Sequence, residues 1–350
     1  MKSLPTGTIS RSGRFAKAGI NTGGNYLRHY LGNSLPIKNL HQDKSTLNRK
    51  NAVSIFKELV QLRGLPLKLA QGISMDTGLL PIEFTEVMNA AQYSVPPMNR
   101  ALVRTQFKRN FNKYPEDLFK SFEYNAFAAA TIGQVHHAIG SNGKKLAVKV
   151  QYPNVRKTIF SDMKLLSLFG KSFFKDIDFE KYLNELLDTL LEETDYLKEG
   201  KNIQKFRDTF TFKDIIFPEY LPSKSNKHIL TMTYLKGDHL DKLISEEPDQ
   251  KTRNNYGQII WDFFHENINS SNNIFHADVH PGNFIFCKGG KVGVIDFGCI
   301  KIFPDQFIKS CIRLLQKYLN GSYQEFLNEL ENMDFIKNGS KLSDKEKKIE

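Results

Sequence analysis

The chain has 350 residues, of which 40% are hydrophobic and 25% are charged, and its formal net charge is +11. This composition is that of an ordinary soluble globular protein, and the length allows two lobes plus an extension. No apolar run approaches the ~18 residues of a membrane-spanning helix, and the N-terminus lacks the apolar core of a secretory signal, so neither is expected.

Positive charge is concentrated in residues 1–50, which contain nine Lys or Arg and a single acid, Asp43. Basic N-terminal segments bind nucleic acid or anionic membrane surfaces, and the alternative is a segment that is simply solvated. Because nothing in the chain resembles a DNA- or RNA-binding module, the membrane surface is the preferred partner and nucleic acid is not expected.

The first 115 or so residues are predicted to be helical. In residues 51–63 the apolar side chains recur at helical spacing, and Gly64 and Pro66 then end the helix. Residues 1–50 are instead rich in Gly, Asn, Ser and Thr, with flexible flanks. The predicted helices are residues 20–31, 51–63 and 98–112, with further helical stretches that begin at residues 67 and 81.

From about residue 116 the pattern changes to strands and then to a mostly helical half. One long amphipathic helix is predicted over residues 182–202, with its leucines on one side. The predicted strands are residues 126–138, 145–151, 228–234, 284–287 and 291–295, and further helices cover residues 256–267 and begin after Pro304. This order predicts an α+β, protein-kinase-like, two-lobed fold with a helical N-terminal extension.

Three cysteines, Cys287, Cys299 and Cys311, lie twelve residues apart and form no C-x-x-C motif. Unpaired thiols with this spacing indicate a reduced, cytosolic compartment.

Two short motifs indicate phosphoryl transfer. Residues 276–283 read H-A-D-V-H-P-G-N and fit the kinase catalytic loop H-x-D-x-x-x-x-N, and residues 294–298 supply an Asp-Phe-Gly segment. Mg²⁺ prefers oxygen ligands, so Asn283 and Asp296 are the metal candidates. Asp278 would accept a proton or hold the attacking hydroxyl or water in line. A polar turn between two buried strands is the alternative interpretation.

A candidate nucleotide loop lies upstream. Residues 128–135 read A-A-A-T-I-G-Q-V and can be aligned with G-x-G-x-x-G-x-V, with alanine in place of the first two glycines. Glycine lets backbone N–H groups approach phosphate, so the alanines predict a stiffer loop with altered nucleotide preference or rate. The candidate nucleotide-binding residues of this loop are Ala128, Ala129, Ala130, Thr131, Gly133 and Val135.

Residues 146–149 read L-A-V-K and fit V-A-I-K, so Lys149 is the candidate to hold the α- and β-phosphates. Its acidic partner is expected on the following helix, where Glu193 and Glu199 are the candidates and Asp195 lies nearby; a charged helix face is the alternative for each. Ala277 replaces the arginine that usually precedes the catalytic Asp, and no A-P-E follows Asp-Phe-Gly, which argues against an ordinary protein kinase.

With these motifs the chain resembles the UbiB/AarF family of atypical kinase-like ATPases, which is linked to isoprenoid quinone biosynthesis. Residues 128–131 resemble the family's A-A-A-S signature, residues 193–195 fit its E-x-D, and Asp278, Asn283 and Asp296 fall on its catalytic and metal positions. Residues 68–71, K-L-A-Q, resemble its K-x-G-Q motif with Ala in place of Gly. The resemblance runs from about residue 4 to residue 333.

The resemblance implies a kinase-like fold whose N-terminal extension folds over the active site. Lys68 and Gln71 would then occupy the space in which a protein kinase binds peptide, so ATPase activity with ATP and Mg²⁺ is expected over protein phosphorylation. The expected parts are a basic, partly flexible segment (1–50), a helical extension with the K-x-G-Q-like motif (51–115), a kinase-like N-lobe (116–236) and a kinase-like C-lobe (237–350) that is either small or truncated.

The partners implied are ATP, an anionic membrane surface, quinone-precursor lipids and quinone-biosynthetic enzymes; a homodimer is left open. The expected location is cytoplasmic, peripheral at the inner membrane face. Two alternatives remain: a small-molecule phosphotransferase of the aminoglycoside or choline kinase type, which would not need Lys68 and Gln71, and a non-catalytic scaffold of a lipid-biosynthetic complex. The second alternative does not explain why all four motif residues are present, namely Lys149, Asp278, Asn283 and Asp296.

Overall fold

The computed structural model describes residues 13, 17, 49–51, 53–54, 97–130, 132–170, 179–269, 273–278 and 280–336. These residues fall into two compact units. The first takes the described residues up to Phe210 together with Phe217–Lys236 and Val294–Cys299, and the second takes Thr211–Ile216, Gly237–Gly293 and the described residues from Ile300 onward. Within the described part of the chain, no helix is both long and apolar enough to cross a membrane.

The predicted helices at residues 20–31 and those that begin at residues 67 and 81 lie outside the described residues. Of the helix predicted over residues 51–63, only residues 51, 53 and 54 are described, and they are helical. The four-part division of the chain therefore stays a prediction.

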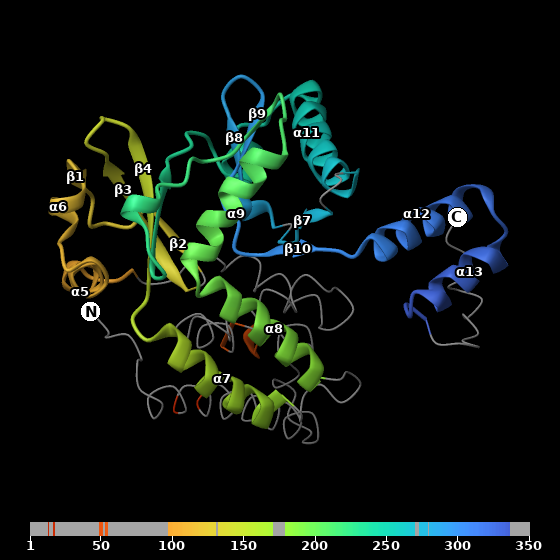
Figure 1. Ribbon diagram of the computed structural model, residues 1–350, viewed down its shortest axis with the longest axis horizontal. Coiled ribbons are helices and arrows are strands. Elements are labelled where there is room, and N and C mark those ends of the chain that lie inside the picture. The colour runs from red at the N-terminus through yellow and green to blue at the C-terminus, as the bar shows by residue number, and fades with distance from the viewer. Residues whose placement is uncertain are drawn as a thin grey trace, which may run out of the picture. The chain divides into compact units, whose positions relative to one another are not determined.

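The first unit is built on an antiparallel sheet with the order β1-β3-β4-β6, to which β2 adds by pairing with β3 (Figure 1). Its strands are β1 (Ser121–Phe122), β2 (Ala128–Ala130), β3 (Gly133–Ile139), β4 (Lys145–Gln151) and β6 (Ile229–Thr233). The predicted strands over residues 145–151 and 228–234 are confirmed, the second shortened by one residue at each end.

The single strand predicted over residues 126–138 is wrong. The chain reverses within this segment, and β2 pairs with β3 in the registers Ala128↔Val135 and Ala130↔Gly133. The reversal lies between the paired residues Ala130 and Gly133; the sequence between them is Thr-Ile, with none of the Gly, Pro, Asn or Asp residues that usually mark a turn. Alternation of side chains alone therefore could not reveal it.

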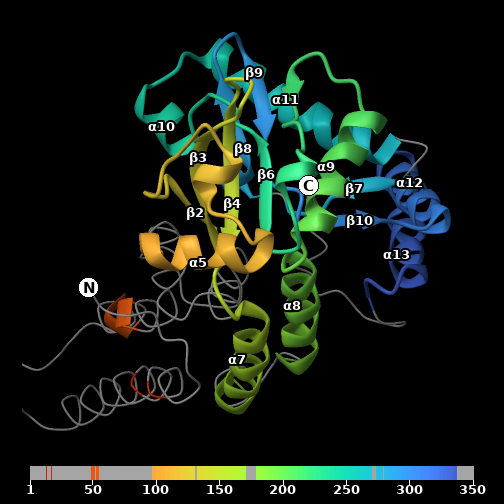
Figure 2. The same cartoon turned by 60° about the vertical axis from the view of Figure 1, so that its left-hand side comes forward.

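Along the described part of the chain, five helices and a 3-10 turn precede this sheet or lie between its strands. They are α5 (Arg100–Phe111), α6 (Pro115–Leu118), α7 (Val155–Gly170), α8 (Phe179–Glu193), α9 (Tyr196–Thr209) and η1 (Pro222–Lys224). Helix α5 contacts β4 and helix α9 contacts β6, while α7 and α8 lie side by side in both Figure 1 and Figure 2. The helix predicted over residues 98–112 is confirmed as α5. Helix α7 was not among the predicted elements.

The long helix predicted over residues 182–202 is wrong as one element, because the structure divides it into α8 and α9. The side chain of Asp195 caps the second helix: its Oδ1 accepts hydrogen bonds from the backbone N–H groups of Leu197 at 3.2 Å and Lys198 at 3.3 Å. An acceptor of this kind satisfies N–H groups that have no partner inside the helix. The break therefore gives α9 a direction of its own, and α9 carries Glu199.

The second unit contains two small sheets and four helices. The sheets have the orders β5-β9-β8 and β10-β7. The elements are β5 (Ile215–Ile216), α10 (Leu240–Ser245), α11 (Gln250–Asn269), β7 (Ile274–His276), η2 (Pro281–Asn283), β8 (Phe284–Cys287), β9 (Lys291–Val294), β10 (Ile300–Ile302), α12 (Asp305–Asn320) and α13 (Tyr323–Asn332). The strands predicted over residues 284–287 and 291–295 and the helices within α11 and after Pro304 are confirmed.

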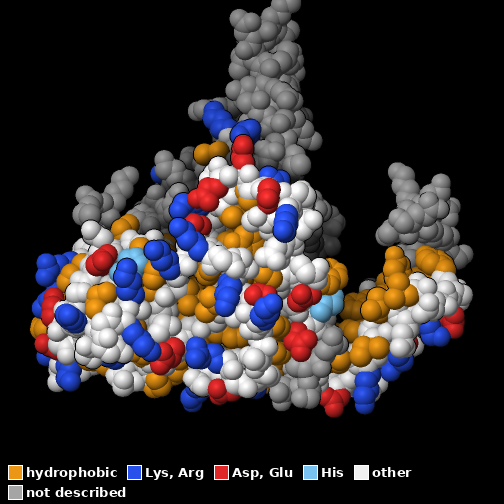
Figure 3. All heavy atoms as spheres, turned by 90° about the horizontal axis from the view of Figure 1, so that it is seen from above, with side chains coloured by type: hydrophobic (Ala, Val, Ile, Leu, Met, Phe, Trp, Pro, Cys, Tyr) orange, Lys and Arg blue, Asp and Glu red, His pale blue; other side chains and the backbone are white. Residues whose placement is uncertain are grey.

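The core of the second unit lies where α11 meets β7 and β8. The Phe263 ring is fully buried and lies 6.3 Å from the ring of Phe284 and 6.0 Å from that of His276. Helices α12 and α13 contact each other, yet large apolar side chains along them stay exposed, which Figure 3 shows as an orange area at the right of the molecule. The loop that follows β7 is therefore positioned by the buried cluster of Phe263, Phe284 and His276, and not by α12 and α13.

Candidate functional site

The first unit brings together three of the predicted site residues. The ammonium Nζ of Lys149, on β4, lies 2.5 Å from Oε1 of Glu199, on α9, and 2.9 Å from Oδ2 of Asp296. The side chains of Lys149 and Glu199 are only 7% and 4% exposed, whereas that of Asp296 is 34% exposed. A buried cation is thus held by one buried and one accessible carboxylate.

The local structure explains why these residues meet. Strand β4 is buried on both faces, with Val148 and Val150 fully covered, so Lys149 between them has no route to bulk solvent along the strand. An unpaired ammonium in such a place would be costly. The start of α9 at Tyr196 places Glu199 in its first turn, opposite β4, and supplies the compensating charge.

Electrostatics decide which members of this cluster are charged. Burial by itself would lower the pKa of the Lys149 ammonium, but the carboxylates of Asp296 and Glu199 outweigh it and raise this pKa above its ordinary value. Burial raises the pKa of Glu199 to about 7; the negative charge of Asp296 adds to the shift, and the Lys149 ammonium opposes it. Lys149 is therefore a permanent cation, and Glu199 titrates near neutrality.

Helix α9 also holds the Asp-Phe-Gly segment. The backbone N–H of Phe297 donates to Glu199 Oε1 at 3.4 Å, and Asn202 Nδ2 donates to the Phe297 carbonyl at 2.9 Å. The Phe297 ring is fully buried and lies 5.3 Å from the ring of Phe206. These contacts direct the Asp296 carboxylate toward Lys149. Asn202 was not predicted, and its place one turn beyond Glu199 is the only signal that the sequence offers.

The predicted nucleotide loop is the β2–β3 hairpin. Ala130 pairs with Gly133 next to the turn, while Thr131 lies outside the described residues. A Cβ atom at Gly133 would lie 2.6 Å from the carbonyl oxygen of Val150 and 2.8 Å from the hydroxyl of Tyr196. Glycine is therefore needed here for close packing against β4 and α9. Tyr196 is buried and electrostatically coupled to Lys149, and sequence reasoning missed it.

Glu193 and Asp195, the other acidic candidates, do not form the ion pair seen at Glu199. Asp195 caps α9, and its Oδ2 lies 3.8 Å from Nζ of Lys227. Glu193 ends α8, and its Cγ lies 3.4 Å from the position that a Cβ on Gly298 would take. Glu193 is thus adjacent to the Asp-Phe-Gly segment, while Asp195 belongs to the helix cap.

The second unit holds the catalytic-loop motif. Asn283 ends the turn η2, and its Nδ2 donates to the backbone carbonyl of Asp278 at 2.9 Å. His280 Nδ1 accepts from the backbone N–H of Gly282 at 3.0 Å and so supports the same turn. His276, in β7, is 3% exposed. The loop is therefore closed by its own side chains, with Asp278 and Asn283 joined by a hydrogen bond.

Two groups of predicted residues are not placed. Lys68 and Gln71 lie outside the described residues, and so does most of the basic segment 1–50. Across the described part of the chain, no three His, Cys, Asp or Glu side chains form a group that could hold a metal ion. Mg²⁺ in kinase sites is held by one or two protein oxygens and by substrate phosphates, so it does not require such a group.

Comparisons with known proteins show the family and the fold of this chain. Residues 90–330 match the family model described as the ABC1 atypical kinase-like domain. Among solved structures, Rv3197 of Mycobacterium tuberculosis, in complex with erythromycin, matches with a TM-score of 0.58 and 25% identity over 86% of this chain and 78% of that chain. The predicted α+β, kinase-like fold is thereby confirmed.

Curated relatives carry kinase names. The probable serine/threonine-protein kinase abkA of Dictyostelium discoideum is 27% identical over 93% of this chain and 61% of its own length. Mitochondrial atypical kinase COQ8 of Saccharomyces cerevisiae is 29% identical over 89% and 63%, and mitochondrial atypical kinase coq-8 of Caenorhabditis elegans is 28% identical over 83% and 39%. This chain therefore spans less than two thirds of the length of each.

Proposed function

Because this chain belongs to the ABC1 atypical kinase-like family, we propose that it binds Mg-ATP and acts as an atypical kinase-like ATPase that supports isoprenoid quinone biosynthesis at a membrane surface. The predicted resemblance to the AarF kinases is confirmed, since a relative 28% identical over 76% of this chain carries that name. The activity, its substrate and its place in quinone synthesis are inferences from the site and from the family.

The observation that carries the proposal is the cluster of Lys149, Glu199 and Asp296. Its donors fit a nucleotide: the ammonium is permanently charged, and the Asp296 carboxylate is accessible while its Oδ1 accepts from the Gly298 N–H at 2.9 Å. A buried ammonium fixed in this way suits phosphate oxygens, and an accessible carboxylate suits Mg²⁺. The bound metal ion would neutralise charge that develops on the transferred phosphoryl group.

The remaining roles follow from the motifs. Asp278 would hold the attacking hydroxyl or water, and Asn283 with Asp296 would provide oxygen ligands for Mg²⁺. Lys68 and Gln71 are assigned to exclusion of peptide substrates, which favours ATP hydrolysis over protein phosphorylation. The small-molecule phosphotransferase and the scaffold are less well supported, because the chain matches the ABC1 model over residues 90–330 and keeps the charged cluster.

Phosphate release from Mg-ATP tests the activity directly, with and without anionic liposomes and a quinone-precursor phenol. Asp296→Asn should lower turnover on the order of 100-fold or more, because loss of the metal-binding carboxylate removes several kcal/mol of charge stabilisation. Asp208→Asn, at an exposed position on α9, is the matched control and should leave turnover unchanged. Equal Mg-ATP affinity of Asp296→Asn and wild type by calorimetry, with both folded, would overturn the assignment.

Attachment to the membrane is assigned to residues 1–50. Nine cations, at roughly 1 kcal/mol for each that reaches an anionic surface, suffice for reversible binding even if about half engage. Flotation with anionic vesicles should show the full chain bound at low salt and released as salt rises, because screening shortens the electrostatic reach. A chain lacking residues 1–50 that floats equally well would show that the segment serves another purpose.

A further inference from the structure

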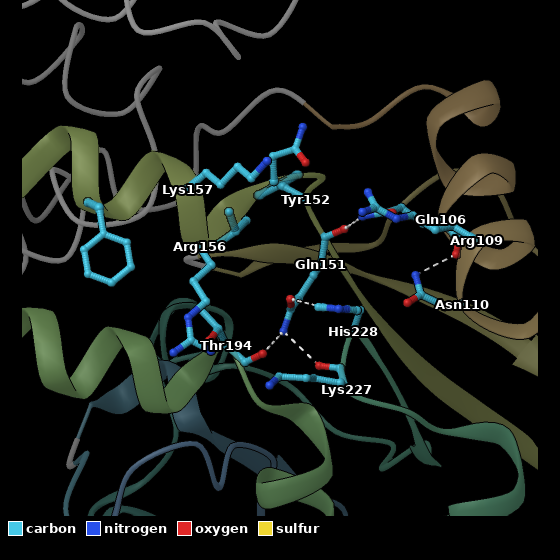
Figure 4. Close-up of a pocket in the computed structure, with 13 residues that line it drawn as sticks. Gln106, Arg109, Asn110, Gln151, Tyr152, Arg156, Lys157, Thr194, Lys227 and His228 are labelled. Atoms are coloured by element: carbon cyan, nitrogen blue, oxygen red, sulfur yellow. Dashed lines mark hydrogen bonds between the residues drawn. The ribbon is translucent and has the colours of Figure 1, made fainter.

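The first unit contains a pocket that is separate from the cluster around Lys149. Its volume is about 360 Å³, and it is lined by thirteen described residues from α5, the end of β4, the start of α7, the turn before α9 and the segment before β6 (Figure 4). Lys149, Glu199 and Asp296 are not among them. A volume of this size falls in the range of small-molecule sites.

The lining carries a strong positive charge. Four cationic side chains line the pocket, Arg109 from α5, Arg156 and Lys157 from α7, and Lys227 from the segment before β6, and none of the thirteen lining residues is Asp or Glu. One of these cations, Lys227, forms an ion pair, since its Nζ lies 3.8 Å from Asp195 Oδ2. Among the described residues, four cations and one paired carboxylate leave a surplus of positive charge that an anionic ligand would neutralise.

The pocket floor is fixed by hydrogen bonds around Gln151, which is 2% exposed. Its Nε2 donates to the carbonyls of Thr194 at 2.8 Å and Lys227 at 3.3 Å, and its Oε1 lies 3.0 Å from His228 Nδ1 (Figure 4). Its backbone carbonyl accepts from Gln106 Nε2 at 2.8 Å. The four chain segments are therefore held together by hydrogen bonds within the protein itself.

Two of these cations lie at the start of α7. This helix has 16 residues, no acid in its first turn, and two cations there, Arg156 and Lys157. A helix N-terminus has partial positive charge, so cations in the first turn are unfavourable. An anion bound between these two side chains and the N-terminus of α7 would offset the repulsion between the cations and the helix dipole.

The positive charges of the pocket also affect the pKa of His228. Burial lowers the pKa of its imidazole, and the neighbouring charges of Lys227 and Arg109 lower it further. The imidazole is thus neutral at physiological pH, so His228 lines the pocket as a polar group and does not add a fifth positive charge.

We infer that this pocket binds a small organic molecule through a phosphate or diphosphate group. Arginine guanidinium groups match the oxygens of a phosphate in pairs, and lysine adds a point charge. Val155, Tyr152 and Phe160 give the same pocket an apolar side, so the ligand carries an apolar part beside the anionic group. The phosphate could come from a soluble metabolite or from a lipid headgroup, and this inference is independent of the proposed ATPase.

Calorimetry with inorganic pyrophosphate and the full chain, in the presence of EDTA, tests the charged end of the site. The double variant Arg156→Gln with Lys227→Gln should weaken binding at least about tenfold, since hydrogen bonds from charged donors to phosphate are stronger than those between neutral groups. The control removes the same charge from exposed positions of α9, Lys201→Gln with Lys205→Gln, and should change binding less than about twofold. The charge-conserving pair Arg156→Lys with Lys227→Arg should recover part of the affinity, and the melting temperatures show that all variants are folded.

Vesicles of phosphatidylcholine with phosphatidic acid distinguish the two sources. If the pocket variant floats less well than the α9 control, the ligand is a lipid headgroup; if both float equally while pyrophosphate binding differs, it is a soluble phosphate. Equal pyrophosphate binding by the pocket variant and the control, or an equal loss in both, would overturn the inference, because another site or general charge would then account for the binding.

Discussion

Lys149 and Glu199 are fifty residues apart in the chain, yet Nζ of one lies 2.5 Å from Oε1 of the other inside the first unit. The pair joins the strand that would hold phosphate to the helix that holds the Asp-Phe-Gly segment, because Glu199 also accepts from the backbone N–H of Phe297. Breaking a buried pair by removing one partner typically destabilises a protein by about 3–5 kcal/mol. Four predictions follow from this pair and from the hairpin beside it.

Glu199→Gln should weaken ATP binding and lower turnover on the order of tenfold or more, because the Lys149 ammonium would lose the carboxylate that fixes it. Glutamine keeps the shape and one acceptor, so the chain should still fold. Glu185→Gln, at an exposed position of α8, is the control and should behave like wild type. Calorimetric ATP titration with a turnover assay measures both, and an unchanged ATP affinity in Glu199→Gln would contradict the role given to this pair.

The pH dependence of activity should reflect Glu199, whose pKa burial raises from 4.5 to about 7. The ionised carboxylate orders Lys149, so turnover should fall as the pH drops through about 7. Stability changes in the opposite direction. Between pH 4.5 and about 7 the native state keeps a proton that the unfolded chain releases, so this group's contribution is full below pH 4.5 and is lost as the pH approaches 7.

The measurement is the free energy of unfolding of wild type and Glu199→Gln between pH 5 and 8. Relative to the variant, wild type should lose stability as the pH rises, by at most about 3 kcal/mol for a shift of this size. A difference between the two proteins that is constant across this range would show that Glu199 does not titrate there.

Ala130→Gly should change the affinity for ATP relative to ADP and increase self-labelling with ATP. Ala130 pairs with Gly133 beside the turn of the hairpin, and glycine there would let the backbone flex and approach phosphate. Ala129→Gly, on the same strand but exposed, carries the same cost in backbone entropy and is the matched control. If both variants give identical nucleotide affinities and labelling, the side chain of Ala130 does not tune the loop.

Gly133→Ala should destabilise the chain by about 1–3 kcal/mol, because the added methyl group would lie 2.6 Å from the Val150 carbonyl oxygen and 2.8 Å from the Tyr196 hydroxyl. Tyr196 begins α9, so ATP affinity should fall as well. Gly257→Ala, in α11, meets no atom within 4 Å and should be neutral or slightly stabilising. Thermal unfolding compares the two, and equal melting temperatures would show that the hairpin can move away from β4.

The positions of some strands follow closely from the sequence. Strand β4 begins and ends where the alternation of its residues predicts, and strand β8 does likewise. Local patterns are sufficient there because each strand is bounded by a turn with its usual residues, such as Gly143 or Gly289 and Gly290, all of which have positive φ. Where such residues are missing, as at residues 131–132, the prediction is wrong.

The sequence by itself determined the chemistry: the residue types and spacing of the motifs around Asp278, Asn283 and Asp296, and the family they indicate. It could not choose between Glu193 and Glu199, because both lie on what reads as one charged helix. Only the tertiary structure decided this, through the break at Asp195, which begins a new helix and directs Glu199 toward Lys149. The pairing depends on contacts between residues far apart in the chain. No local sequence pattern predicts the direction in which a helix runs from its N-cap.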